Sequence, residues 1–123
     1  MSKVRPAELA ARLERGEQLF VLDIRPESNF HAGHIDGSQN IPVYDDLRRG
    51  NTATLEDRLG AIPADRDVVT VCKAGIVAKR ATKVLEAEGY EAKTLEGGWR
   101  GWRGYQSNSL GYRLKSAVNK LLP

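Results

Sequence analysis

The only cysteine of this chain, Cys72, stands at a position that suits covalent chemistry. It follows the β-branched run 68–71 and precedes a short segment that leads into a helical pattern. A thiol at such a strand-to-helix turn faces the unpaired N–H groups and the positive dipole end of the helix, which stabilise the thiolate, the nucleophilic form of cysteine. Free cysteine is also among the most buried residue types, so the position alone fits a reactive thiol and a buried one equally well.

A single cysteine limits what the site can be. It excludes an intrachain disulfide, and the sequence has no cluster of cysteines and histidines with the spacing of a structural zinc site. We expect neither a metal nor an organic cofactor. Cys72 must therefore act alone or with a partner molecule, and any group that it carries must leave to an external acceptor.

The composition is typical of one globular domain. Of the 123 residues, 41% are hydrophobic and 28% are charged. The net charge of +3 is small and acidic residues are interspersed, so no nucleic-acid partner is expected. No apolar stretch resembles a signal peptide or approaches the roughly 20 residues that cross a membrane, which predicts a soluble cytoplasmic protein.

The hydrophobic pattern predicts strands that alternate with helices. Buried strands are predicted over residues 19–24, 68–71 and 91–95, and helices over 6–14 and from 75 to a stop signal at Gly89. Between them we expect a helical turn over 27–31, a loop with brief extended pieces over 33–42, a partly helical stretch over 44–59 and a short helix around Trp99. This order predicts a mostly parallel sheet, in which ligands bind at the carboxyl ends of the strands. Cys72 lies at one of these ends.

Short motifs follow one another in a specific order along residues 6–103. They are Leu22-Asp23-Ile24-Arg25 with Phe30, Gly33-His34-Ile35-Asp36-Gly37-Ser38, Asn40-Ile41-Pro42, Val71-Cys72-Lys73-Ala74-Gly75, and Gly89-Tyr90 with Leu95-Glu96-Gly97-Gly98-Trp99. Each motif alone is weak, but their joint order and spacing are specific. The chain resembles a rhodanese-like domain.

The resemblance implies a fold and a chemistry. The fold is α/β, with a parallel sheet of about five strands flanked by helices on both faces, here over residues 1–104. In catalytic members the loop cysteine attacks a sulfur donor such as thiosulfate, becomes a persulfide, and passes the outer sulfur to cyanide or a thiol. Backbone N–H groups of the six-residue loop that begins at the cysteine surround the persulfide, forming a nest for an anion.

The resemblance also implies site residues for a rhodanese-type sulfurtransferase. Cys72 is the predicted nucleophile, and the predicted substrate-binding residues are Lys73, Ala74, Gly75, Ile76 and Val77 of the loop, together with Arg25. Related phosphatases of the same fold have a loop one residue longer, closed by an arginine six positions after the cysteine. That position is Ala78 in this chain, so we do not expect phosphatase activity.

The side chains of the loop bear on the choice of substrate. Lys73 is charged, whereas Ala74, Ile76 and Val77 are apolar. A doubly charged thiosulfate would rely on Lys73, the amides and the helix end, so a less charged donor, such as a protein persulfide, is expected to suit this loop better. The acceptor would be a small thiol or a thioredoxin-like protein. The alternative function is a catalytically weak rhodanese-like module that binds other proteins.

Other residues near the motifs have two interpretations each. Asp23 could hold Lys73 or could form a purely structural ion pair. His34 could act as a base or could fix its loop by hydrogen bonds. Trp99 and Trp102 could form an aromatic nucleic-acid surface or could pack a short helix on the core. We favour the structural interpretation in each case.

Residues 105–123 form a basic tail without acidic residues. Its apolar residues share one helical face: Leu110, Leu114, Ala117, Val118 and Leu121. The pattern predicts an amphipathic helix that packs on its own domain, with a partner protein or a membrane surface as alternatives.

Overall fold

The computed structural model describes residues 2–108. The elements follow in the order β1 (Lys3–Val4), α1 (Pro6–Glu14), β2 (Phe20–Asp23), α2 (Glu27–Ala32), β3 (Gln39–Asn40), α3 (Tyr44–Arg48), α4 (Ala53–Glu56), the 3-10 helix η1 (Leu59–Ala61), β4 (Val68–Val71), α5 (Ala78–Ala87) and β5 (Ala92–Leu95). A further helix occupies residues 98–108, up to the last described residue. The strands predicted over 19–24, 68–71 and 91–95 form as β2, β4 and β5, whereas β1 was not predicted and α5 begins later than expected.

The strands make one five-stranded sheet with the order β1-β5-β4-β2-β3. All neighbouring strands are parallel, and the register sets Asp23 beside Val71. All four residues of β4 are buried, as expected for a strand that is covered on both faces. Because β2 and β4 are parallel neighbours, the segments that follow them, with Arg25 and Cys72, leave the sheet at the same edge. The predicted α/β fold with a parallel sheet is confirmed.

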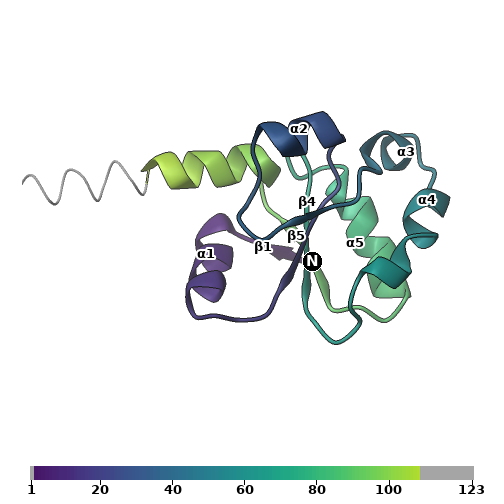
Figure 1. Cartoon of the computed structure of the whole chain (residues 1–123), viewed down its shortest axis with the longest axis horizontal. Helices are drawn as coiled ribbons and strands as arrows, with labels where there is room; N and C mark the ends of the chain where they lie inside the picture. Colours follow the sequence, from purple (N-terminus) through teal and green to yellow (C-terminus); the bar gives the residue numbers. More distant parts are fainter. Residues whose placement is uncertain (1, 109–123) are drawn as a thin grey trace, which may run out of the picture.

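Helices cover both faces of the sheet (Figure 1). On one face, α3, α4 and α5 contribute Leu47, Leu55 and Leu85 to a hydrophobic cluster. On the other face, Leu9 of α1 and Trp102 of the helix over 98–108 belong to a second cluster. The two clusters are the two halves of the hydrophobic core, separated by the sheet.

Successive residues of β4 point to opposite faces of the sheet, as the strand geometry requires. Val68 belongs to the cluster on the α5 face, whereas Val69 and Val71 belong to the cluster on the α1 face. Cys72 lies two residues after Thr70 and again belongs to the cluster on the α5 face. This alternation directs the thiol toward the first turn of α5.

The helix over residues 98–108 extends away from the domain on the side of α1 (Figure 1). Trp102 is buried, and Trp99 is half-buried against the same cluster, so both rings pack on the core as we favoured. The predicted apolar face from Leu110 to Leu121 lies outside the described residues.

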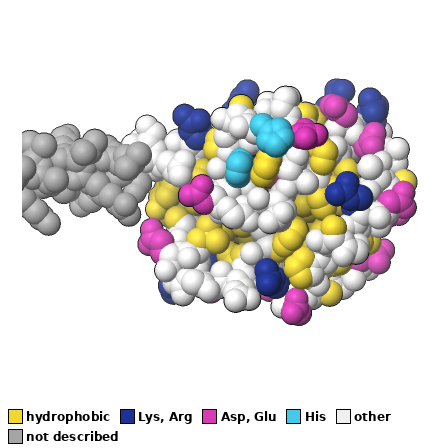
Figure 2. Space-filling view, viewed as in Figure 1, with side chains coloured by type: hydrophobic (Ala, Val, Ile, Leu, Met, Phe, Trp, Pro, Cys, Tyr) yellow, Lys and Arg dark blue, Asp and Glu magenta, His cyan; other side chains and the backbone are white. Residues whose placement is uncertain are grey.

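Two surface properties bear on partners. Within residues 2–108, no helix combines the length and the apolar character that crossing a membrane requires. On the face drawn in Figure 2, acidic and basic side chains are interspersed, and no large patch of one sign is visible.

Candidate active site

Cys72 opens a loop over residues 72–77 that joins the end of β4 to the start of α5. Its Sγ atom accepts hydrogen bonds from the backbone N–H groups of Gly75, at 3.1 Å, and Ala78, at 3.3 Å. Only 1% of the Cys72 surface is exposed. Two amide dipoles directed at one buried sulfur stabilise a negative charge on it, as a thiolate carries.

The loop explains why α5 starts at Ala78 and not at residue 75, where the sequence pattern predicted its start. Gly75 has a φ of +87°, in the left-handed region that favours glycine. The chain therefore curls around the sulfur before it becomes helical. Ala78 is the first residue of α5, and its N–H group, which has no partner within the helix, is directed at Sγ.

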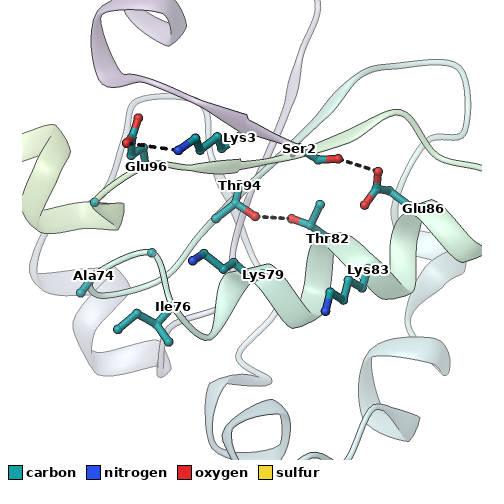
Figure 3. A pocket seen from close by; sticks show the side chains of 12 residues that line it. Ser2, Lys3, Ala74, Ile76, Lys79, Thr82, Lys83, Glu86, Thr94 and Glu96 are labelled. Carbon is teal, nitrogen blue, oxygen red and sulfur yellow. Dashed lines mark hydrogen bonds and ion pairs between the residues drawn. The ribbon is translucent and has the colours of Figure 1, made fainter.

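A chain of buried threonine hydroxyls fixes the first turn of α5. The Thr70 hydroxyl donates to the carbonyl oxygen of Ala78 at 3.2 Å and lies 2.8 Å from the Thr82 hydroxyl. Thr82 in turn bonds Thr94 at 2.7 Å, as Figure 3 shows. These hydroxyls link β4, α5 and β5. They therefore hold in place the helix that supplies one of the two N–H donors to the Cys72 sulfur. These hydroxyl contacts were not predicted from the sequence, although Thr70 within the apolar run 68–71 is a signal of a buried hydroxyl.

The helix over residues 98–108 holds the opposite side of the loop. The backbone N–H of Trp99 donates to the carbonyl oxygen of Cys72 at 2.8 Å, and that of Arg100 donates to the carbonyl oxygen of Lys73 at 3.2 Å. The first N–H groups of a helix have no partners within it, so the loop carbonyls satisfy them. The cysteine loop thus lies between the starts of two helices.

The predicted loop residues differ in exposure. Lys73, Ala74 and Ile76 are exposed, Val77 is half-buried and Gly75 is buried. Ile76 is 72% exposed and is the exposed large hydrophobic side chain among residues 2–108. The Lys73 ammonium lies 4.6 Å from the centre of the Tyr44 ring. The loop therefore presents one cation and an apolar tip to solvent.

A cavity of about 490 Å³ borders the loop on the side of α5 and β1. Ala74, Gly75 and Ile76 of the loop line it together with Lys79 and Lys83 of α5. Figure 3 shows Ala74 and Ile76 beside the two lysines. Two polar contacts lie among its lining residues: an ion pair of Lys3 in β1 with Glu96, which follows β5, and a hydrogen bond from Ser2 to Glu86 of α5.

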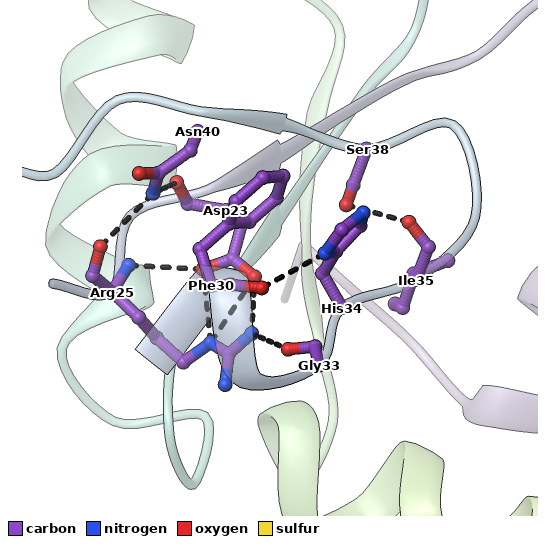
Figure 4. A network of polar contacts seen from close by, with 8 residues as sticks. All are labelled: Asp23, Arg25, Phe30, Gly33, His34, Ile35, Ser38 and Asn40. Atoms are coloured by element: carbon purple, nitrogen blue, oxygen red, sulfur yellow. Dashed lines mark hydrogen bonds and ion pairs between the residues drawn. The ribbon is translucent and has the colours of Figure 1, made fainter. Parts of the chain in front are cut away.

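Arg25 was predicted to bind the substrate, but its guanidinium group is bonded to other groups inside the protein. It is 2% exposed and forms a two-pronged ion pair with Asp23, with Nε at 3.0 Å from Oδ1 and Nη2 at 2.8 Å from Oδ2. Nη2 also donates to the carbonyl oxygen of Gly33 at 2.7 Å. Figure 4 shows how Asn40 completes this network by donating to the carbonyl oxygens of Asp23 and Arg25.

This network decides between the two interpretations of Asp23. The carboxylate pairs with Arg25 and not with Lys73, so the structural interpretation is confirmed. Arg25 nevertheless reaches a second cavity, which it lines together with Lys73. His34 stacks on Phe30 at 3.9 Å between ring centres, and its Nδ1 donates to the Phe30 carbonyl oxygen at 2.8 Å (Figure 4). These contacts give His34 a role in fixing its loop.

The described residues contain no group of three or more His, Cys, Asp or Glu side chains that could hold a metal ion. The candidate active site therefore consists of one sulfur, backbone amides and a cation at the rim. Such an arrangement can stabilise an anionic sulfur through backbone N–H groups without a side-chain base.

Comparison with known proteins gives a consistent result. Residues 5–105 match the family model described as rhodanese-like domain. The thiosulfate sulfurtransferase GlpE of Shewanella oneidensis is 29% identical over 92 residues, which cover 74% of this chain and 82% of that protein. The crystal structure of the rhodanese homolog TT1651 from Thermus thermophilus is 36% identical, with a TM-score of 0.56, covering 81% of this chain and 99% of that one.

One relative has a different kind of name. The HTH-type transcriptional regulator Rv0324 of Mycobacterium tuberculosis is 38% identical over 99 residues. The match covers 79% of this chain but only 39% of the regulator, so the similarity concerns one part of a longer protein.

Proposed function

Because this chain belongs to the rhodanese-like domain family, we propose that it is a sulfurtransferase in which Cys72 carries sulfane sulfur as a persulfide. One observation carries the proposal: the only cysteine lies at the carboxyl end of β4 with its Sγ bonded by two backbone N–H groups. Relatives that are named as sulfurtransferases support it.

The first half of the reaction loads the cysteine. With thiosulfate as donor, the Cys72 thiolate attacks the outer sulfur, and the sulfur–sulfur bond of the donor breaks. Sulfite leaves with the bonding electron pair, and a Cys72 persulfide anion remains. With a persulfide donor, a thiolate leaves in place of sulfite. Before the attack, the amides of Gly75 and Ala78 stabilise the negative charge of the Cys72 thiolate. In the persulfide anion the charge lies on the outer sulfur, which is bonded directly to Sγ and so stays near the same amides.

The second half of the reaction transfers the sulfur from Cys72 to an acceptor. An acceptor thiolate attacks the outer sulfur of the persulfide, the Cys72 sulfur–sulfur bond breaks, and the thiolate of Cys72 is restored while the acceptor becomes a persulfide. Since the chain has one cysteine, no internal thiol can resolve the persulfide. The acceptor is therefore an external molecule, a small thiol, cyanide or a thioredoxin-like protein.

The loop side chains favour a donor of low charge. Beside the sulfur, Lys73 is the charged loop residue, and the exposed tip of the loop is Ile76. Within the loop itself, the two negative charges of thiosulfate meet one solvated ammonium, whereas a persulfide on a protein surface can also contact the apolar tip. A competition between thiosulfate and a cysteine-desulfurase persulfide tests this preference, and preferential loading by thiosulfate contradicts it.

Mass spectrometry of the intact protein tests the function itself. After incubation with either donor, we expect the mass to increase by one sulfur atom and to return on addition of a thiol. Cys72→Ser is the matched control, because it keeps the size of the side chain and removes the nucleophile. Persistence of the added sulfur in this variant would place the reaction elsewhere.

The second candidate function is a catalytically weak module that binds other proteins. Two observations favour it: a similar sequence forms part of a transcriptional regulator, and the loop exposes Ile76 beside a nearly inaccessible Cys72. If no donor adds sulfur to Cys72 in the folded protein, this second function replaces the first.

A further inference from the structure

A second cavity, of about 320 Å³, lies between α2, the cysteine loop and the helix over residues 98–108. Its lining residues are Arg25, Asn29, Ala32, Gly33, Lys73, Trp99, Arg100 and Arg103. Four of these side chains are cationic and none is acidic. On the face drawn in Figure 2 both signs are interspersed, and the first cavity is lined by Glu86 and Glu96 as well as by lysines, so the absence of acidic side chains distinguishes this lining from both.

The charges in this cavity are not all compensated. Asp23 neutralises Arg25 through their buried ion pair. Lys73, Arg100 and Arg103 form no ion pair with any side chain in the described part of the chain. Three cations gathered around one hollow raise the local positive potential and attract an anion.

Trp99 provides the apolar side of the same cavity. The guanidinium carbons of Arg25 and Arg103 lie 4.7 Å and 5.7 Å from the centre of its ring. Stacking on an aromatic ring fixes the plane of a guanidinium group while leaving its N–H edge available for a carboxylate. The cavity thus combines an aromatic ring surface with guanidinium N–H donors of defined orientation.

The cavity is joined to the sulfur site through Lys73. This residue follows Cys72 directly and lines the cavity, and its carbonyl oxygen accepts the backbone N–H of Arg100. A ligand that occupies the cavity therefore lies beside the loop that carries the persulfide. The volume is at the lower end of the roughly 300–1,000 Å³ typical of small-molecule sites, which suits a metabolite more than a protein segment.

We propose that this cavity binds the carboxylate of a small thiol acceptor, with Arg100 and Arg103 as the residues that determine specificity for it. The proposal rests on the proposed sulfur transfer and names the class of acceptor. A guanidinium fork matches a planar carboxylate in two hydrogen bonds, whereas the Lys73 ammonium contributes as a point charge. Acceptors without a carboxylate gain nothing from these groups.

Two thiols of similar length test the proposal, 3-mercaptopropionate with a carboxylate and 2-mercaptoethanol without one. The rate of sulfur release from preloaded protein is measured with each thiol in wild type and in Arg100→Gln/Arg103→Gln. We expect the rate with 3-mercaptopropionate to fall about fivefold to tenfold and that with 2-mercaptoethanol to change less than about twofold, as for loss of partly screened charge-assisted contacts. Arg58→Gln/Arg66→Gln, at two exposed arginines before β4, is the matched control for loss of two charges.

Three outcomes would overturn the proposal. An equal effect on both thiols points to a damaged loop, and no effect shows that the arginines do not bind the acceptor. If the double variant slows loading by thiosulfate but not release to 3-mercaptopropionate, the cavity serves the anionic donor. The variant Arg100→Lys/Arg103→Lys separates charge from geometry, because it is expected to recover only part of the lost rate.

A binding measurement separates this proposal from the proposed function. 3-(Methylthio)propionate has the same carboxylate but no reactive sulfur. We expect it to shift the NMR signal of the Trp99 indole N–H in wild type and in Cys72→Ser, and not in Arg100→Gln/Arg103→Gln. A shift in a protein that never loads sulfur would refute sulfur transfer alone. Efficient loading without a shift or a preference between the thiols would refute the cavity alone.

Discussion

Gly98 and Cys72 are in backbone contact: a Cβ atom at position 98 would lie 2.5 Å from the carbonyl oxygen of Cys72 and 2.7 Å from the amide nitrogen of Gly75. Gly98 also has a φ of +57°, which residues with a side chain rarely adopt. The start of the helix over residues 98–108 can therefore approach the loop closely enough for Trp99 to bond Cys72. The position of the cysteine loop therefore depends on residue 98 having no side chain.

Gly98→Ala is expected to displace the loop. The new methyl group meets backbone atoms that cannot rotate away, so we expect sulfur loading to slow at least about tenfold, since small displacements of reacting groups have large kinetic effects. The free energy of unfolding should fall by about 1–3 kcal/mol because of the strained backbone. Gly104→Ala is the control, since a Cβ there meets nothing within 4 Å. Normal loading by Gly98→Ala would show that the contact does not position the sulfur.

Thr82→Val is expected to interrupt the buried hydroxyl chain. Thr94 loses its hydroxyl partner, and an unpaired buried polar group costs about 1–3 kcal/mol, which urea unfolding can measure. In Thr82→Val/Thr94→Val the stranded hydroxyl is also removed, so part of the lost stability should return. A double variant that is less stable by the sum of the two single effects would argue against a coupled chain.

Asp23→Asn is expected to leave the buried Arg25 charge without its partner. Breaking one side of a buried ion pair typically costs about 3–5 kcal/mol, and thermal or chemical unfolding should show a loss of this size. Asp65→Asn, at an exposed loop position, removes the same charge and should leave stability nearly unchanged. Lys73→Ala should also have little effect on stability, because Asp23 does not pair with Lys73. A large loss in Lys73→Ala would contradict this assignment.

Ile76→Arg is expected to improve the use of thiosulfate. The side chain is 72% exposed at the tip of the loop, so the fold should tolerate the change. An added cation near the sulfur attracts a doubly charged donor, and we expect loading by thiosulfate to accelerate about twofold to fivefold at low salt and less at high salt. Ile76→Gln controls for loss of the apolar surface. Equal acceleration in both variants would mean that charge is not the cause.

Stability should decline in acid partly through Glu17. Hydrogen bonds from Arg12, which has the larger effect, and from Arg15 hold the pKa of Glu17 below its ordinary value of 4.5. A carboxyl whose pKa is lower in the folded state stabilises the fold above its unfolded pKa and loses this contribution as the pH falls through the folded pKa. In Glu17→Gln we therefore expect a smaller drop in Tm between about pH 5 and about pH 3. Identical profiles for Glu17→Gln and wild type would contradict the assignment.

The sequence pattern predicted the main elements because their causes are local. The buried run 68–71 has no polar residue except Thr70 and forms β4, and the helical spacing after Gly75 forms α5. The parallel sheet follows from the alternation of these elements. The strand β1 escaped prediction because two residues carry no periodicity, and they become a strand only by pairing with β5.

The candidate site was predictable where it is built from consecutive residues and unpredictable where it is built across the fold. Cys72 and its loop follow from the ordered motifs. The bonds from Trp99 and Arg100 to the loop carbonyls, and the gathering of Arg100 and Arg103 around Lys73, depend on how one helix docks beside another segment. No local spacing in the sequence encodes these contacts.

The sheet ends at both sides in very short strands, β1 (Lys3–Val4) and β3 (Gln39–Asn40), of two residues each. Unpaired edge strands are the sites at which sheets of different molecules join and aggregate, and short edges present few free backbone groups for this. A domain with such edges can lie beside other domains, or beside copies of itself, without its sheet growing into theirs. Such a domain can form part of longer proteins, and a similar sequence occupies 39% of a longer regulator in Mycobacterium tuberculosis.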